Sequence, residues 1–207
     1  MRPAVFLDRD GVLNIPVFRD GRSYAPRRVA DFHLYPEAAD AVGRLGRAGF
    51  LVVVVTNQPD IGANLVSAAD VEKMHERLMA AMSIDAIELC PDTREQAASA
   101  ARPRRKPAPG MLLDAAERLG IDLPRSFMVG DRTSDIEAGL AAGCRATVFI
   151  DRGYTVETRP HDQAATVTDL GMAVTWILAE ADKLALEQTN DRRIDLRTTG
   201  GSDRVQR

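Results

Sequence analysis

The chain has 207 residues and a formal net charge of −3, with 45% hydrophobic and 28% charged residues. This length allows one large domain or two small ones, and we expect one. The weak negative charge excludes a broad basic surface for nucleic acid, and no run approaches the about 20 apolar residues of a membrane span. We therefore expect small-molecule partners, a cytoplasmic location and a monomer or small homo-oligomer.

The first part of the chain predicts two buried strands with a helix between them. Ala4–Leu7 and Phe50–Thr56 are short apolar runs, the second rich in β-branched residues, as in parallel strands covered on both faces. Pro36–Gly49 begins with proline, repeats apolar residues at helical spacing and ends with glycine, which is typical of a helix.

The alternation of strands and helices continues to the last third of the chain. Further helices are predicted at Ala68–Met82, Gly110–Leu119, Asp135–Ala142 and Asp169–Leu186, and further strands at Ile84–Leu89, Phe127–Val129 and Ala146–Ile150. Such alternation predicts right-handed crossovers and helices on both faces of a parallel sheet. The fold class is therefore α/β, a Rossmann-like three-layer sandwich with a mostly parallel central sheet.

Three segments stand outside this rhythm. Asn14–His33 and Pro91–Pro109 are polar or rich in arginine and proline, and we interpret both as functional loops. Residues 189–207 are polar with almost no large apolar side chains, which predicts a disordered tail. We expect residues 1–188 to form the folded domain.

Acidic residues follow two of the predicted strands. Asp8 and Asp10 come after the first strand, and Asp131 comes after Phe127–Val129. Ligands of open parallel sheets bind beyond the carboxyl ends of strands, so these acids should meet there. Neighbouring carboxylates repel one another unless a cation lies between them, and a set of oxygen ligands favours Mg²⁺. We predict a magnesium site formed by Asp8, Asp131 and the backbone at Asp10.

These residues also suit phosphoryl transfer. Asp8 would attack a bound phosphate and form an aspartyl-phosphate, while Asp10 would act as general acid and then general base. The Thr56 hydroxyl and Lys106 would stabilise the phosphoryl oxygens. Taken singly, each residue has a structural interpretation: Asp-x-Asp-Gly is also found in strand-end turns and calcium loops, and Lys106 could be a solvated loop charge.

Four motifs in this order resemble the haloacid dehalogenase superfamily, over roughly residues 4–150. They are Phe6-Leu-Asp-Arg-Asp-Gly-Val-Leu-Asn14, Val55-Thr-Asn-Gln58, Arg105-Lys-Pro-Ala-Pro-Gly-Met111, and Met128-Val-Gly-Asp131 with Asp135. The sequences of these motifs are similar to those of the branch that contains heptose bisphosphate phosphatases and histidinol-phosphate phosphatases. Members of this branch lack a large cap domain. The resemblance implies the same roles for Asp8, Asp10, Thr56, Lys106 and Asp131.

The resemblance also suggests residues that contact substrate. The positions matching Arg105 and Arg132 help to recognise substrate in the heptose enzymes, and Asn57 and Gln58 belong to the second motif. Asp135 is a weaker candidate for the site. The substrate implied is a small phosphorylated metabolite, with a heptose bisphosphate first and histidinol phosphate or another sugar phosphate as alternatives.

The chain departs from this branch in two places. Many members hold a structural zinc with four ligands, of which only Cys90 is present here, so we expect no zinc. In the same loop Arg102 and Arg104 are weaker candidates for binding a second phosphate, the alternative being a solvated loop. The family usually has glycine where Asp60 stands, and an acid there keeps histidinol phosphate as an alternative.

Two other functions are alternatives to a phosphatase. A phosphate-binding scaffold that lost catalysis would not need all of the residues that the phosphatase motifs retain. A response-regulator-like receiver also uses an aspartate and Mg²⁺, but its phosphorylated aspartate lies on a later strand. His33, His75 and His161 are scattered, and we interpret them as surface or packing residues.

Overall fold

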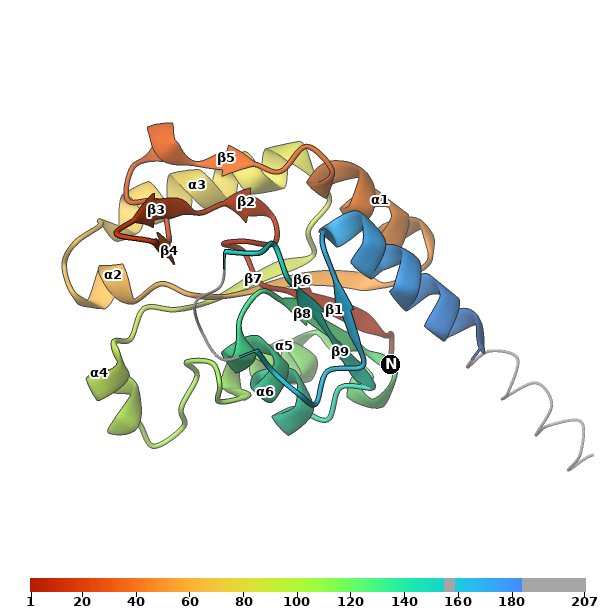
Figure 1. The fold of residues 1–207 in the computed structure, drawn as a ribbon. Helices are drawn as coiled ribbons and strands as arrows, with labels where there is room; N and C mark the ends of the chain where they lie inside the picture. The colour runs from red at the N-terminus through yellow and green to blue at the C-terminus, as the bar shows by residue number, and fades with distance from the viewer. Residues whose placement is uncertain (155–158, 184–207) are drawn as a thin grey trace, which may run out of the picture.

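The computed structural model describes residues 1–154 and 159–183, and its centre is a six-stranded sheet (Figure 1). The strand order is β10-β9-β8-β1-β6-β7, and every neighbouring pair is parallel. The strands are β1 (Ala4–Leu7), β6 (Leu51–Asn57), β7 (Ala86–Cys90), β8 (Phe127–Gly130), β9 (Ala146–Ile150) and β10 (Ala165–Val167). The predicted α/β class with a parallel central sheet is confirmed.

Helices cover both faces of the sheet (Figure 1). Those of ten or more residues are α1 (Ala38–Arg47), α3 (Ala68–Ala81) and α5 (Gly110–Leu119); α6 (Thr133–Ala141) is slightly shorter, and residues 170–183 are also helical. The short ones are α2 (Pro59–Gly62), α4 (Arg94–Ala98), η1 (Val29–Asp31) and η2 (Leu123–Arg125). The helix predicted at Asp135 begins at Thr133 instead, because the Asp135 carboxylate accepts a hydrogen bond from the Arg132 backbone N–H and lies inside the first turn.

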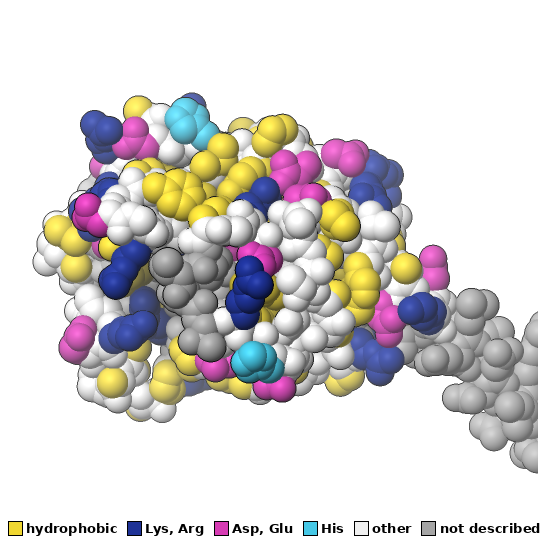
Figure 2. Space-filling view, in the orientation of Figure 1, with side chains coloured by type: hydrophobic (Ala, Val, Ile, Leu, Met, Phe, Trp, Pro, Cys, Tyr) yellow, Lys and Arg dark blue, Asp and Glu magenta, His cyan; other side chains and the backbone are white. Residues whose placement is uncertain are grey.

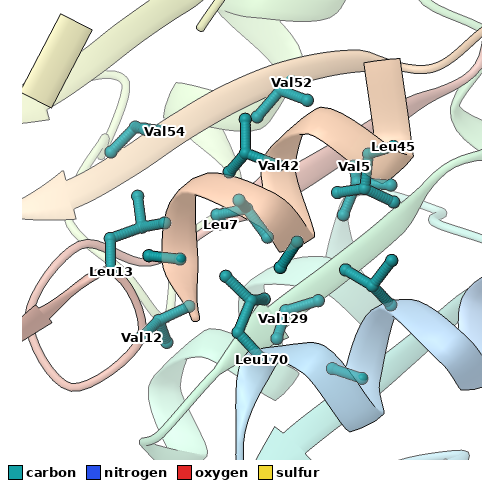
Figure 3. Packing of buried hydrophobic residues seen from close by; sticks show 14 of the residues in the cluster. Val5, Leu7, Val12, Leu13, Val42, Leu45, Val52, Val54, Val129 and Leu170 are labelled. Atoms are coloured by element: carbon teal, nitrogen blue, oxygen red, sulfur yellow. The ribbon is translucent and has the colours of Figure 1, made fainter. Parts of the chain in front are cut away.

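Two buried clusters hold the layers together, one on each face of the sheet. Along β1, Val5 and Leu7 belong to one cluster, whereas Ala4 and Phe6 belong to the other. The first cluster packs β1 and β6 against α1, α3 and the 170–183 helix. Figure 3 labels members of the cluster from β1, β6, α1 and the start of the 170–183 helix. The second packs the opposite face against α5 and α6. Side chains alternate between the two faces, as the period of a strand requires.

The predicted loop Asn14–His33 contains secondary structure that the sequence pattern did not indicate. β3 (Val17–Arg19) and β4 (Arg22–Tyr24) form an antiparallel hairpin, and β2 (Asn14–Ile15) pairs with β5 (His33–Leu34). The turn of the hairpin has Asp20 at φ 49° and Gly21 at φ 72°, a left-handed pair that suits a tight turn. The loop Pro91–Pro109 likewise contains α4.

The predicted disordered tail at residues 189–207 lies outside the described residues. The single-domain boundary at residue 188 also stays a prediction for this reason. In the described parts of the chain, no helix has both the length and the apolar character needed to cross a bilayer.

Candidate active site

Three buried carboxylates meet at the carboxyl edge of the sheet. Asp8 follows β1, Asp131 follows β8, and Asp135 lies in the first turn of α6. Each offers a carboxylate oxygen, and these oxygens lie within 4.8 Å of one another. β1 is hydrogen-bonded to β8 on one side, so the end of each strand brings its acid to the same place.

Two glycines make this close approach possible. A Cβ atom on Gly11, which has φ +91°, would lie 2.1 Å from Asp131 Oδ2. A Cβ on Gly130 would lie 2.2 Å from Asp135 Oδ2. No side chain fits at either distance, so the glycine inside the first motif and the glycine before Asp131 are needed to bring the acids together.

Lys106 joins two of the acids. Its Nζ lies 2.7 Å from Asp8 Oδ1 and 2.6 Å from Asp135 Oδ1, and it donates to the Val55 carbonyl at 2.7 Å. Asn57 holds the backbone of Lys106 through two hydrogen bonds, accepting from its N–H at 3.1 Å and donating to its carbonyl at 3.0 Å. Asn57 thus positions the lysine from the end of β6.

Burial and the neighbouring charges shift the pKa values of the groups in this cluster. Burial, with the nearby charges of Asp135 and Asp10, raises the pKa of Asp8 to about 6, although Lys106 acts in the opposite direction. Burial and the charge of Asp8 also raise the pKa of Asp131. Burial lowers the pKa of Lys106, but Asp135 and Asp8 outweigh it and the net shift is upward. Repulsion between buried carboxylates is the condition that a hard divalent cation relieves, so the donor set fits Mg²⁺.

The Asp10 carboxylate lies apart from this group. It accepts hydrogen bonds from Gln58 Nε2 at 2.7 Å, Asn14 Nδ2 at 3.0 Å and Arg9 Nη2 at 3.0 Å. Gln58 also donates to the Thr56 hydroxyl at 2.8 Å. Asp10 is therefore oriented by three donors and is not one of the acids grouped around Asp8, Asp131 and Asp135 in the described residues.

A cavity of about 600 Å³ opens in front of the cluster. Seven of the predicted site residues line it: Asp8, Asp10, Asn57, Arg105, Lys106, Arg132 and Asp135. Five others are not part of its lining: Thr56, Gln58, Asp131, Arg102 and Arg104. Of these, Thr56, Gln58 and Asp131 are buried beneath it. In Figure 2, Lys and Arg side chains gather on the left side of the molecule, in the region between α4 and the β3–β4 hairpin of Figure 1.

Arg102 and Arg104 point to another part of the fold. Arg102 pairs with Asp114 on α5 at 2.8 Å, and Arg104 pairs with Asp114 at 2.8 Å and with Glu88 on β7. The structure therefore does not bring these two predicted residues to the cavity. Cys90 is buried on β7, 3.5 Å from an Asp92 oxygen. The expected absence of zinc stays a prediction.

Three further residues of this region were not predicted as site residues. Arg94 on α4 and Asp60 on α2 line the cavity, and Asp60 pairs with Arg27 at 2.6 Å. The Tyr154 hydroxyl lies 3.4 Å from Asp131 Oδ2. The sequence named Asp60 only as a departure from the family pattern and gave no local signal for Arg94 or Tyr154. These three residues come from separate segments of the chain, and only the folded structure shows that the segments meet at this site.

Comparisons with known proteins identify the family of this chain. A HAD-hydrolase-like family model matches residues 103–173. The D-glycero-beta-D-manno-heptose-1,7-bisphosphate 7-phosphatase of Rhodopseudomonas palustris is 37% identical over 150 residues, which cover 69% of this chain and 80% of that protein. The corresponding enzyme of Thermosynechococcus vestitus is 38% identical over 196 residues, covering 85% and 95%.

A solved structure gives the same result at the level of the fold. The D,D-heptose 1,7-bisphosphate phosphatase from B. bronchiseptica, complexed with magnesium and phosphate, superposes with a TM-score of 0.72 at 28% identity, covering 86% of this chain and 99% of that one. Fold and site together define a phosphoric monoester hydrolase with a Rossmann-like core. The chain belongs to the haloacid dehalogenase-like hydrolases, and the relatives described here are heptose bisphosphate phosphatases.

Proposed function

We propose that the chain removes the 7-phosphate of a D-glycero-D-manno-heptose 1,7-bisphosphate through an aspartyl-phosphate on Asp8. The observation that carries this proposal is the position of Asp8, whose carboxylate lines the cavity and lies 2.7 Å from Lys106 Nζ. The printed names of the relatives supply the substrate class. A buried carboxylate next to a fixed cation is a suitable nucleophile for a phosphoryl group.

The reaction proceeds in two steps. In the first, an Asp8 carboxylate oxygen forms a bond to phosphorus while the ester bond breaks, and Asp10 donates a proton to the departing sugar oxygen. In the second, a water molecule attacks the same phosphorus, and Asp10 takes its proton as the bond to Asp8 breaks. The three hydrogen bonds to Asp10 hold its carboxylate in one orientation for both transfers.

Lys106 and the acids around it set the charge of the site. Lys106 lies where it can neutralise a phosphoryl oxygen, and Asn57 prevents its backbone from shifting. Asp8 and Asp131, with the backbone of Asp10 as the sequence predicts, would hold Mg²⁺, and the Asp135 carboxylate lies within reach of the same ion. When bound, the ion supplies positive charge to phosphate oxygens and relieves repulsion among the acids. The sequence predicts that the Thr56 hydroxyl stabilises phosphoryl oxygens, but Thr56 is buried and is not part of the cavity lining. Its hydroxyl accepts a hydrogen bond from Gln58 and so orients the side chain that holds Asp10.

The test measures phosphate release from the heptose bisphosphate with Mg²⁺ and with EDTA. ³¹P NMR should show loss of the 7-phosphate signal while the anomeric phosphate remains. Borohydride added to an acid-quenched reaction should reduce the acyl phosphate and convert Asp8 to homoserine, which peptide mass spectrometry detects. Asp8→Asn should lower kcat at least about a thousandfold, as expected for loss of a nucleophile.

Asp31→Asn is the matched control, because Asp31 belongs to an exposed ion pair with Arg28. It should leave turnover unchanged. Absence of metal-dependent turnover on the bisphosphate and on p-nitrophenyl phosphate would overturn the proposal and favour a phosphate-binding scaffold.

A further inference from the structure

The arginines near the cavity form two groups with different surroundings. Arg102 and Arg104 face acids of α5 and β7, so their charges are already paired within the fold. Arg94, Arg105 and Arg132 line the cavity itself. Among the residues that the structure describes, neither Arg94 nor Arg105 forms an ion pair with a carboxylate; Arg105 Nη1 donates only to the Asp92 backbone carbonyl, at 2.9 Å.

The cavity-lining group keeps like charges close together. Burial, together with the charges of Arg94 and Arg132, lowers the pKa of the Arg105 guanidinium. Guanidinium groups held near one another repel, and a bound anion turns that repulsion into attraction. This wall of the cavity is therefore suited to a negatively charged group.

Arg94 is held at the cavity by the local structure of α4. Thr93 caps the helix: its side chain accepts from the Gln96 N–H at 3.3 Å, and Gln96 Oε1 accepts from the Thr93 N–H at 2.8 Å. The Gly62 N–H of α2 donates to the Pro91 carbonyl at 3.1 Å, which ties the preceding loop to the body of the protein. The capping box fixes the backbone of the first helical residue, here Arg94, and so sets the point at the cavity from which its side chain extends.

The lining of the cavity also includes an acid whose charge is compensated. Asp60 lines the cavity, and Arg27 Nε binds its Oδ2 at 2.6 Å. Asp60 therefore does not cancel the positive wall formed by Arg94 and Arg105. The outer end of the cavity favours an anion over the cationic group that a free acid at position 60 would have attracted.

We infer that Arg94, acting with Arg105, forms an outer anion subsite for the phosphate that is not hydrolysed, so that Arg94 determines specificity for bisphosphorylated substrates. This inference rests on the proposed function, because the inner phosphate must be at Asp8 for the outer one to reach α4. It also moves the second-phosphate role from Arg102 and Arg104, the predicted candidates, to a residue on the preceding helix.

The experiment compares heptose 1,7-bisphosphate with heptose 7-phosphate in the full-length Mg²⁺-loaded enzyme. Arg94→Ala should raise KM for the bisphosphate on the order of tenfold, as expected for a partly exposed charge-assisted contact. Its KM for the monophosphate and its kcat for both substrates should change less than about twofold. Arg94→Lys should recover part of the bisphosphate KM, because the charge remains and the bidentate geometry is lost.

Arg102→Ala is the matched control, because Arg102 is an exposed arginine of the same region that pairs with Asp114 outside the cavity. It should change neither KM. D-mannose 1-phosphate serves as a second probe: its competitive inhibition constant should rise in Arg94→Ala and not in Arg102→Ala.

Three outcomes of the variant comparison would overturn the inference. They are an equal KM change for both substrates in Arg94→Ala, no change for either, or a larger bisphosphate effect in Arg102→Ala. A wild-type enzyme that prefers histidinol phosphate, which carries an amino group, would overturn it as well. Absence of turnover by wild type on every phosphate ester would instead refute the proposed function, so the two failures are distinguishable.

Discussion

The inner and outer ends of the cavity are built in different ways. At the inner end, Asp8, Asp135 and Lys106 are buried and within 2.7 Å of a charged partner. At the outer end, Arg94 is exposed and Arg105 half-buried, and both come from the loop between β7 and α5. Lys106 comes from the same loop, but its buried ion pairs with Asp8 and Asp135 and its hydrogen bonds to Asn57 at the end of β6 fix its position. In the described residues, neither Arg94 nor Arg105 has such an ion pair.

This difference predicts that the inner end of the cavity carries out the reaction and the outer end recognises the substrate. Buried charges interact strongly because little water screens them, so removal of one partner has a large effect on both stability and rate. Exposed charges are screened and contribute less. We therefore expect substitutions at the inner end to act on folding and kcat, and substitutions at the outer end to act on KM.

The largest combined effect on stability and rate is expected at Lys106. Lys106→Met leaves Asp8 and Asp135 without their shared cation, so the free energy of unfolding of the metal-free protein should fall by about 3 kcal/mol at neutral pH. With Mg²⁺ present, kcat should fall roughly 100- to 1000-fold, because one donor to the transition state is lost. Urea unfolding with and without Mg²⁺ and steady-state kinetics measure the two effects.

Lys73→Met provides the comparison, because Lys73 pairs with Asp70 on the exposed face of α3 at 3.4 Å. Its free energy of unfolding should change by less than about 0.5 kcal/mol. If Lys106→Met and Lys73→Met lost equal stability, the buried ion pairs of Lys106 would contribute no more to stability than the exposed ion pair of Lys73.

A smaller effect, and one that depends on pH, is expected behind the inner end. His75 is buried, and its Nε2 lies 3.2 Å from Arg9 Nη1 of the fully buried Arg9. Burial and the charge of Arg9 lower the pKa of His75 from 6.5 to about 4. The folded protein therefore favours neutral His75, and this contribution to stability is complete above pH 6.5 and is lost as pH falls toward 4.

The His75→Gln variant isolates this contribution, because glutamine can still accept a hydrogen bond from Arg9 but does not titrate. Between pH 7.5 and pH 5, the wild type should lose about 2 kcal/mol more of its unfolding free energy than the variant does. His33→Gln, at an exposed histidine, should follow the wild type. Urea titrations measure the unfolding free energy at each pH. If this free energy depended on pH in the same way in His75→Gln and in the wild type, the lowered pKa would not belong to His75.

The sequence predicted the inner end of the site because strands were recognisable from composition. Ala4–Leu7 and Ala146–Ile150 are strands with the predicted bounds. Once the strands were placed, the acids following β1 and β8 had to meet at one edge of the sheet. The sequence did not indicate β10, because a three-residue edge strand depends on backbone pairing with β9 and has little apolar pattern of its own.

The outer end could not be predicted in the same way. Arg102 and Arg105 are three residues apart in one loop, yet one pairs with Asp114 on α5 and the other lines the cavity. Their directions are decided by partners from distant segments, which a single sequence does not place. Arg94 was overlooked for the same reason, since its position depends on a five-residue helix inside a segment that resembled a loop.

The smallest expected effect concerns the contact that closes the outer wall. Arg27 and Asp60 join the segment after the β3–β4 hairpin to α2, and both side chains are partly exposed. A double-mutant cycle with Arg27→Ala and Asp60→Asn should give a coupling free energy of about 0.2–1 kcal/mol in urea unfolding. Arg27→Ala alone leaves the Asp60 carboxylate without its partner, so the carboxylate opposes an incoming anion. KM for the bisphosphate should therefore rise about two- to threefold in Arg27→Ala. The rise should be smaller in the double variant Arg27→Ala/Asp60→Asn, which lacks the acid. If the double variant had the higher KM, Asp60 would be aiding substrate binding directly, and the outer wall would recognise hydroxyl groups through its acid as well as phosphate through its arginines.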